Sequence, residues 1–362
     1  MTSSPRNYGL DLARAIAILL VLFIHIYDYF LKTDIGELWY LAYFALDLFF
    51  ALSGFLIGGI LVRQFEKGTG YLPYSTVKTF VYRRWLRTLP LYYLMFLLNL
   101  LMGKYLFHTV SKPDPGYLVF IQNIWHFPPS FFGESWSLAV EEWFYVSFAV
   151  GLGIFLFLTR NRKVRPVLKM LGFTLGYLLV FNMTRLLFAP FDYSEYNMVA
   201  YRLDAAAYGV MIAVLYHYYP VLFQKHRFLT GLTGLLASGS GILVFLLKPK
   251  IGEIYILYYP LIGTGLALIV LYLFLVSNAA GRLYCEKPVR ILSTLAYSLY
   301  LANLPVILLL THFFSYRNRW QTGLGITAAV AGCFLLALAS HFWIEQPFLR
   351  FRDRNVLFES RK

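Results

Sequence analysis

The sequence predicts an all-α membrane protein, a polytopic bundle of about ten transmembrane helices with both termini in the cytoplasm. Three observations carry this prediction: 59% of the 362 residues are hydrophobic, only 14% are charged, and apolar stretches recur along the whole chain. A soluble domain of this length could not bury so much apolar surface. Disordered and fibrous chains need low hydrophobicity or strict repeats, so these classes are excluded as well.

A membrane-spanning helix needs about 20 mostly apolar residues. This length predicts ten spans within one integral-membrane domain that covers residues 1–362. The ten expected spans are 9–31, 38–62, 86–107, 138–158, 168–189, 200–219, 229–247, 254–276, 291–314 and 322–345. The first apolar run is too long for a signal peptide, and no small-residue cleavage site follows it, so we expect it to be retained.

The Lys and Arg residues indicate the orientation, because cytoplasmic loops carry an excess of them. With the N-terminus inside, most of the 32 basic residues fall into the inner loops. The net charge of +14 is therefore interpreted as loop charge, and we expect contacts with membrane lipids and none with nucleic acid. The only two cysteines, Cys285 and Cys333, support neither a disulfide framework nor a metal site. The expected location is the plasma (inner) membrane.

Three arginines fall inside the expected spans, where a charge costs at least ~2.5–3.5 kcal/mol on insertion scales. They are Arg14, Arg185 and Arg202. Arg185 lies near the end of its span, so snorkelling to the interface would explain it equally well. An ion pair with Asp204 would explain Arg202. Arg14 has no such simple explanation.

The first span carries a polar stripe. Arg14 and His25 are eleven residues apart, which places them on one helix face and about 16 Å apart in depth. Asp11 lies one turn before Arg14 on the same face, within reach of an ion pair. The stripe indicates a pathway or a two-ended site, although a hydrogen-bonded core histidine is the alternative interpretation of His25.

Acidic residues also fall within expected spans. Asp47 lies in the second span, in the segment DLFFALSGFLIGG, whose small residues, Ser53 among them, permit close helix approach. Glu141 and Glu142 lie about one turn into the fourth span. Adjacent residues diverge by 100°, so we expect only one of this pair to face the same interior as the neighbouring polar residues. The alternative is solvation at the helix start, where a negative charge suits the helix dipole.

The segment RRWLR opens the third span with Arg83, Arg84 and Arg87. Arginine side chains match the geometry of phosphate oxygens, so this cluster is a candidate site for an anionic ligand. An ordinary positive-inside anchor is the alternative.

Seven segments resemble, in order, motifs of the acyltransferase-3 family of integral membrane O-acyltransferases, over nearly the whole chain. They are YGLDLARAIAILLVLFIH, DLFFALSGFLI, YRRWLRTLPLYY, SWSLAVEEWFY, YRLDAAAYGV, LAYSLYLANLP and HFWIEQPF. One position departs from the pattern: the family often has a histidine where this chain has Asn303. An asparagine cannot carry a proton at neutral pH, so a role for Asn303 as a base is in doubt.

The resemblance implies transfer of an acyl group, commonly acetyl, from cytoplasmic acyl-CoA to a hydroxyl of a cell-surface carbohydrate or glycolipid. No permanently bound cofactor or metal is expected. Arg83, Arg84 and Arg87 would bind the phosphates of acyl-CoA. The expected catalytic residues are His25 as base, Glu141 or Glu142 to orient it, and Arg14 or Arg202 as oxyanion donor. The expected supporting or acceptor-binding residues are Asp11, Asp47, Ser53, Arg202, Asp204, Tyr300 and Asn303.

Two alternatives come from other classes. A transporter or flippase of a glycoconjugate or small anion would equally explain charged groups inside the bundle, and a glycan ligase or polymerase is the second. Turnover of acyl-CoA with release of free thiol would distinguish the acyltransferase from both. No fused soluble domain is expected. The acceptor, the acyl length, the oligomeric state and the choice between direct transfer and an acyl-enzyme stay open.

Overall fold

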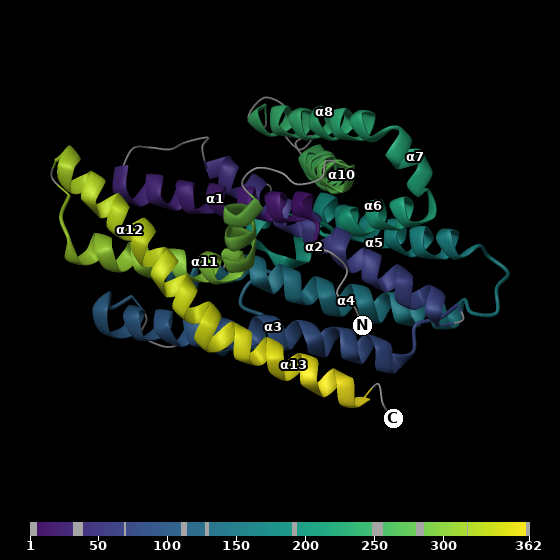
Figure 1. Cartoon of the computed structure of the whole chain (residues 1–362), viewed down its shortest axis with the longest axis horizontal. Coiled ribbons are helices and arrows are strands. Elements are labelled where there is room, and N and C mark those ends of the chain that lie inside the picture. Colours follow the sequence, from purple (N-terminus) through teal and green to yellow (C-terminus); the bar gives the residue numbers. More distant parts are fainter. Residues whose placement is uncertain are drawn as a thin grey trace.

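The computed structural model describes most of the chain, and every structural statement below concerns the described residues. These are residues 6–31, 39–68, 70–109, 114–126, 130–189, 194–247, 256–279, 286–316 and 318–359. They form helices joined by short connections and contain no strand (Figure 1). Cys285 and the first residues of the expected spans 38–62 and 254–276 lie outside the described part.

The helices follow the apolar stretches of the sequence. They are α1 (Tyr8–Leu31), α2 (Trp39–Lys67), α3 (Tyr74–Leu101), α4 (Ser135–Leu158), α5 (Pro166–Phe188), α6 (Ala207–Tyr218), α7 (Pro220–Lys225), α8 (Arg227–Leu246), α10 (Tyr258–Ala279), α11 (Glu286–Phe313), α12 (Arg319–Ser340) and α13 (Gln346–Glu359). Two π-helical turns extend α3 and join α12 to α13: η2 (Met102–Leu106) and η8 (His341–Glu345). The 3₁₀ turns are η3 (Pro115–Leu118), η4 (Ser130–Phe132), η5 (Ser194–Asn197) and η6 (Val199–Tyr201).

Nine helices of the described part are long and apolar enough to cross a membrane. They match nine of the ten expected spans, which confirms the helical, polytopic prediction. The expected span 200–219 instead holds the 12-residue helix α6, preceded by η6 and further turns. At a rise of 1.5 Å per residue α6 is about 18 Å long, shorter than a hydrocarbon core of ~30 Å. The tenth span and the orientation stay predictions.

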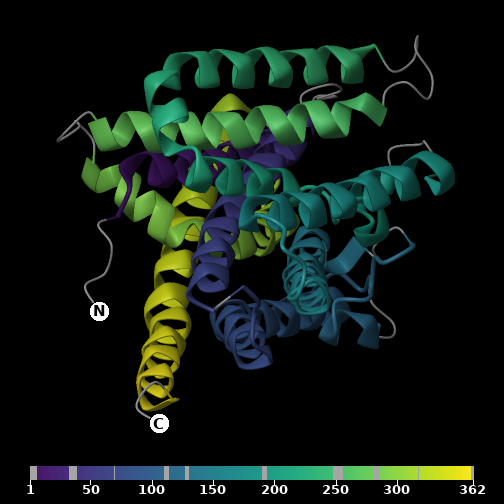
Figure 2. The same cartoon turned by 90° about the vertical axis from the view of Figure 1, so that its right-hand side faces the viewer.

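Two helices extend well beyond the expected boundaries. α3 begins at Tyr74, so the arginines of RRWLR lie within the helix rather than at its entry. α12 continues through η8 into α13 without a break, and α13 packs against α3. Figure 2 shows α12 and α13 crossing the bundle as one continuous element, with α8 and α10 side by side on another face.

Helix α1 contacts α2, α10, α11 and α12 on one face and exposes Ile16, Leu19 and Phe23 on the other. The predicted close approach of small residues is confirmed between α2 and α6. A Cβ atom added at Gly54 would lie 1.8 Å from the Ala206 carbonyl oxygen, and one added at Gly209 would lie 2.2 Å from the Ala51 carbonyl oxygen. Any larger residue at these positions would push the two helices apart.

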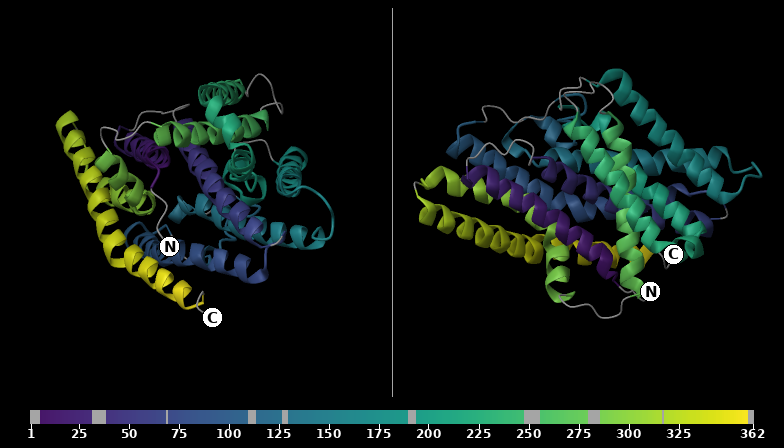
Figure 3. Two further views of the ribbon diagram at one scale, coloured as in Figure 1. Left: turned by 45° about the vertical axis from the view of Figure 1, so that its right-hand side comes forward. Right: turned by 90° about the horizontal axis from the view of Figure 1, so that it is seen from above.

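The two ends of the bundle differ in charge. We call the end where α1, α3, α5 and α11 begin the basic end, because Lys and Arg residues gather in the connections there. The opposite end, where these helices finish and α4 begins, is called the distal end. Figure 3 (right) shows that α1 begins and α13 ends at the same end of the bundle.

Candidate active site

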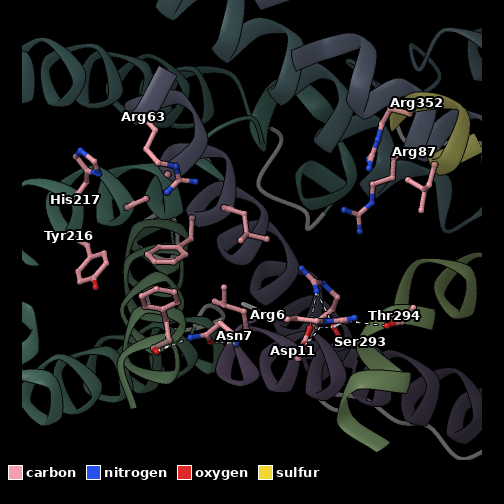
Figure 4. Close-up of a pocket in the computed structure, with 18 of the residues that line it drawn as sticks. Arg6, Asn7, Asp11, Arg63, Arg87, Tyr216, His217, Ser293, Thr294 and Arg352 are labelled. Atoms are coloured by element: carbon pink, nitrogen blue, oxygen red, sulfur yellow. Dashed lines mark hydrogen bonds and ion pairs between the residues drawn. The ribbon is translucent and has the colours of Figure 1, made fainter. Parts of the chain in front are cut away.

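A cavity of about 910 Å³ lies at the basic end, and we call it the basic chamber. Its lining includes five arginines, which are Arg6, Arg14, Arg63, Arg87 and Arg352. Only two acidic side chains, Asp11 and Glu345, belong to the same lining. Figure 4 shows Arg6 on one side of the chamber, and Arg63, Arg87 and Arg352 reaching in from other helices. The chamber therefore carries an excess of positive charge, which suits a polyanionic ligand.

Asp11 organises the α1 wall of the chamber. Its carboxylate accepts a hydrogen bond from Arg6 at 2.7 Å and from the Ser293 hydroxyl at 2.6 Å. Arg14 lies 3.5 Å from Asp11 and donates to Ser293 Oγ at 2.9 Å. The contact expected between Asp11 and Arg14 is thus present, and it holds the Arg14 guanidinium at the chamber wall.

A second cavity of about 100 Å³, the narrow cavity, continues from the chamber toward the distal end. The two linings share Arg14, Leu56, Arg87, Ser293 and Thr294, so the two cavities adjoin one another, and we call the pair the path. Beyond these residues the narrow cavity is lined by polar groups among apolar ones, namely Ser53, Arg84, Thr88, Ser137, Glu141, Tyr145, Tyr297 and Tyr300. The path narrows as it leaves the basic end.

The adjacent acids of α4 point to different neighbours, as the helix geometry predicts. Glu141 lines the narrow cavity and accepts a hydrogen bond from Ser53 Oγ at 2.8 Å. Glu142 turns to α3, where Thr88 Oγ1 donates to it at 2.7 Å. Of the two candidates, Glu141 is the one that faces the path.

The path ends at a polar contact between α4 and α11. The Tyr300 hydroxyl lies 2.6 Å from Ser137 Oγ and donates to the Glu134 carbonyl oxygen at 2.9 Å. One turn further along α11, Asn303 donates through Nδ2 to the Tyr300 carbonyl oxygen at 2.6 Å. This bond fixes the amide, so that Asn303 Oδ1 faces His25 Nδ1 at 2.5 Å.

The contact with Asn303 determines the tautomer of His25. An amide oxygen only accepts, so His25 Nδ1 carries the hydrogen, and the basic nitrogen of the neutral ring is Nε2. The expected histidine–carboxylate arrangement with Glu141 or Glu142 is not the contact that the structure gives. Those carboxylates are bound by Ser53 and Thr88 instead, further along α4 from the distal end.

The other charged residues of the expected spans form two buried ion pairs. Arg202 binds Asp47, which also accepts from the Tyr258 hydroxyl at 3.0 Å. Arg185 binds Asp204, and both side chains are at most 1% exposed. Snorkelling of Arg185 and pairing of Arg202 with Asp204 were therefore wrong interpretations, because each arginine is buried against an acid from a different segment.

An aromatic ring joins the two pairs. The Tyr259 ring lies 3.8 Å from the Arg185 guanidinium carbon and 4.9 Å from that of Arg202. The linings of the chamber and the narrow cavity include neither arginine. The expected oxyanion role of Arg202 thus has no support in its position, and its charge is balanced within the protein.

The three arginines of RRWLR separate in the structure. Arg87 lines both cavities and Arg84 lines the narrow one, with its guanidinium carbon 5.2 Å from the Tyr145 ring centre. Arg83 points to α13 instead, where it lies 3.8 Å from Asp353. Around the helix Arg87 lies between the other two, because it is four residues from Arg83 and three from Arg84, so Arg83 and Arg84 turn to opposite sides of Arg87.

Sequence reasoning missed several residues of the chamber. The charge pattern alone predicts loop charge for Arg6, Arg63 and Arg352, and nothing in a single sequence separates them from topological anchors. His341 and Glu345 belong to the HFWIEQPF segment, which was a usable signal. They lie 2.7 Å apart across the π-helical turn η8, and Ser298 Oγ donates to Glu345 at 3.0 Å.

The described residues thus form a bundle with nine helices long and apolar enough to cross a membrane, an arginine-lined chamber and an adjoining narrow cavity that extends to Tyr300, one turn of α11 before Asn303. The family described as an acyltransferase domain matches residues 7–338, so the chain belongs to the acyltransferase-3 family. The resemblance seen in the sequence is confirmed.

The relatives are named for O-acetylation. The chain is 27% identical over 405 residues to the peptidoglycan O-acetyltransferase OatA of Listeria monocytogenes, covering 100% of this chain and 60% of the relative. It is 26% identical over 367 residues to the putative peptidoglycan O-acetyltransferase YrhL of Bacillus subtilis, covering 94% and 54%. A putative O-acetyltransferase of Staphylococcus aureus is 23% identical over 363 residues, covering 94% and 57%. The chain thus spans little more than half the length of these relatives. No solved structure matches it.

Proposed function

We propose that this protein is a membrane O-acetyltransferase that moves an acetyl group from acetyl-CoA to a hydroxyl of a cell-wall carbohydrate. The observation that carries the proposal is that the arginine-lined chamber adjoins a narrow cavity lined by Tyr300, which lies one turn of α11 before Asn303, the hydrogen-bond partner of His25. The names of the relatives support the acetyl group and the carbohydrate acceptor. The basic end would face the cytoplasm of a plasma (inner) membrane, and the distal end the acceptor.

The chamber suits the nucleotide part of acetyl-CoA. Its volume is near the upper end of the range of about 300–1,000 Å³ for ligand sites. Its arginines supply fork-shaped donors for phosphate oxygens. The acyl-pantetheine arm would extend from the chamber into the narrow cavity, where Glu141 and Ser53 would contact it, and this cavity of about 100 Å³ would widen to admit the arm. Arg84 and Arg87 at the junction of the cavities would bind the end of the nucleotide or the start of the arm.

The reaction at the distal end follows from the tautomer of His25. Nε2 takes the proton of the acceptor hydroxyl, and the hydroxyl oxygen forms a bond to the thioester carbon. The C–S bond then breaks and the sulfur leaves with its electron pair. Arg14 lies about 16 Å from His25 along α1, so we assign Arg14 to donor binding rather than to the oxyanion.

The remaining expected site residues divide by position. Asp11 holds Arg14, Asn303 holds His25, and Tyr300 closes the end of the path. Asp47 and Asp204 belong to the buried ion pairs with Arg202 and Arg185. We propose that these pairs fix the framework around the site and do not touch the substrates.

The test uses the purified protein in lipid vesicles with acetyl-CoA and peptidoglycan fragments. The proposal predicts release of free thiol that depends on the fragments, and loss of about 100-fold or more in His25→Ala, the usual contribution of a general base. The exposed Glu286→Gln is the control. A transporter or flippase would leave the thioester intact, and a His25→Ala variant with wild-type turnover would refute the assignment of the base.

A further inference from the structure

Three aromatic rings form part of the wall of the basic chamber. Phe55 of α2, Tyr216 of α6 and Phe274 of α10 all belong to its lining. The ring centre of Phe274 lies 5.7 Å from that of Phe55 and 5.6 Å from that of Tyr216. Phe55 is only 6% exposed, whereas Tyr216 and Phe274 are partly buried. We call these three residues the aromatic wall, and the donor-binding arginines described above give it no role.

The aromatic wall and the junction with the narrow cavity lie at different sides of the chamber. Arg87, Ser293 and Thr294 line both cavities, so they mark the junction. Figure 4 shows these three residues on one side of the chamber and Tyr216 on the other. A ligand that fills the chamber therefore meets charged and hydroxyl groups near the junction and aromatic rings at the far side.

The aromatic wall is fixed by contacts within the protein. Asn7 Nδ2 donates to the Phe274 carbonyl oxygen at 3.1 Å, and Asn7 Oδ1 accepts from the backbone N–H of Leu10 at 3.1 Å. The Tyr216 ring also packs edge-on against Phe223, with the ring centres 6.4 Å apart. The Asn7 amide is thus engaged in joining the start of α1 to α10. What the wall offers to a ligand is mainly aromatic ring surface.

The order of the groups in acetyl-CoA matches the order of these surfaces. The acyl-pantetheine arm, the diphosphate, the phosphorylated ribose and the adenine follow one another along the molecule. If the arm lies in the narrow cavity and the diphosphate lies beside Arg14 and Arg87, the adenine reaches the far side of the chamber. A purine ring is flat and uncharged, and such rings stack on aromatic side chains.

The position of Arg63 agrees with this order. Figure 4 shows Arg63 on the same side of the chamber as Tyr216, apart from Arg87 and Arg352. In acetyl-CoA the ribose 3′-phosphate is close to the base, and a guanidinium group suits phosphate oxygens. An aromatic wall with an arginine beside it therefore fits a phosphorylated nucleoside better than it fits an uncharged lipid chain.

We infer that the aromatic wall binds the adenine ring of the acyl-CoA donor, an inference that rests on the function proposed above. The base lies against Tyr216 and Phe274, and the buried Phe55 packs against Phe274. The wall thus makes the protein select a thioester that carries the whole nucleotide over one that ends at phosphopantetheine.

The experiment compares two donors, acetyl-CoA and S-acetyl phosphopantetheine, which lacks the adenosine part. The protein is assayed in vesicles with peptidoglycan fragments. Tyr216→Leu and Phe274→Leu should each raise the KM for acetyl-CoA about tenfold at unchanged turnover, because a base–aromatic contact is lost. The KM for S-acetyl phosphopantetheine should stay at the wild-type value in both variants.

Two control variants accompany this comparison. Tyr216→Phe keeps the ring and should keep the wild-type KM for acetyl-CoA. Phe228→Leu removes an aromatic residue of α8 that is 66% exposed and lies outside the chamber lining, and it should have no effect on either donor. If both leucine variants keep the wild-type KM for acetyl-CoA, or raise the KM equally for the two donors, the inference is wrong.

A binding measurement tests the wall without turnover. Adenosine 3′,5′-bisphosphate carries the base and lacks the arm. In calorimetry it should bind the wild type and Tyr216→Phe equally well, and Tyr216→Leu about tenfold more weakly. Equal binding to all three would contradict the inference, and so would a lipid that is extracted from the wild type but absent from Tyr216→Leu. If Tyr216→Leu does not fold, Phe274→Leu takes its place. A wild type that does not turn over acetyl-CoA would refute the proposed function itself, whereas the other outcomes in an active protein refute only the adenine site.

Discussion

The basic and distal ends of the bundle differ in how far their positive side chains are balanced by negative ones. At the basic end, five arginines and two acids line one open chamber, and although Arg6 and Arg14 share Asp11 and Arg352 pairs with Asp353, the arginines outnumber these acids. At the distal end, Arg185 and Arg202 are each matched by one acid, and the groups around His25 are an amide and hydroxyls. The comparison indicates that charged residues within the spans mark a ligand site only where one sign of charge outnumbers the other among the surrounding side chains. Balanced pairs build the framework.

The largest effect should come from breaking a balanced pair. Arg185→Met leaves Asp204 buried without its partner, which typically costs ~3–5 kcal/mol. Thermal unfolding in detergent should show a large drop in stability. Arg290→Met, which breaks the exposed pair with Glu286, should change stability by less than ~1 kcal/mol. Equal losses in the two variants would remove the distinction between framework and surface pairs.

A smaller effect, on turnover alone, is expected at Asn303. Asn303→Ala removes the acceptor that holds His25 Nδ1, so Nε2 is no longer fixed as the basic nitrogen. Turnover should fall at least about tenfold with an unchanged KM for acetyl-CoA. Asn303→Asp keeps an acceptor and should lose less than Asn303→Ala. If the alanine variant is the more active of the two, Asn303 does not set the tautomer.

At the basic end the expected effect is on donor binding. Arg87→Ala should raise the KM for acetyl-CoA about tenfold at nearly unchanged turnover, because it removes one charge-assisted bond of about 1.5 kcal/mol. Arg83 points to Asp353 and lies outside the chamber lining. Arg83→Ala should therefore leave the KM within about twofold, and an equal rise in both variants would mean that the whole RRWLR segment binds the donor.

The sequence predicted the fold class and the helix face along which Arg14 and His25 are aligned, because both depend on local patterns. Apolar runs set the spans, and the eleven-residue spacing placed Arg14 and His25 on one face of α1. The partners of buried charges were not predictable, since Asp47 and Arg202 are 155 residues apart and nothing local pairs them. The shortness of α6 follows from the same cause, because the segment before it turns to place Arg202 and Asp204 against their partners.

The chamber arginines were missed for a related reason. An arginine in a loop is usually a topological anchor. Arg352 enters the chamber only because α12 continues through η8 into α13.

The central claim is that the acetyl group enters at the basic end and leaves at the distal end. Vesicles with the protein in one known orientation test it directly, with acetyl-CoA on the side of the basic end and membrane-impermeant peptidoglycan fragments on the opposite side. The proposed path predicts O-acetylated fragments opposite to the donor, and none with His25→Ala. Product that forms only when donor and fragments share one side would contradict it.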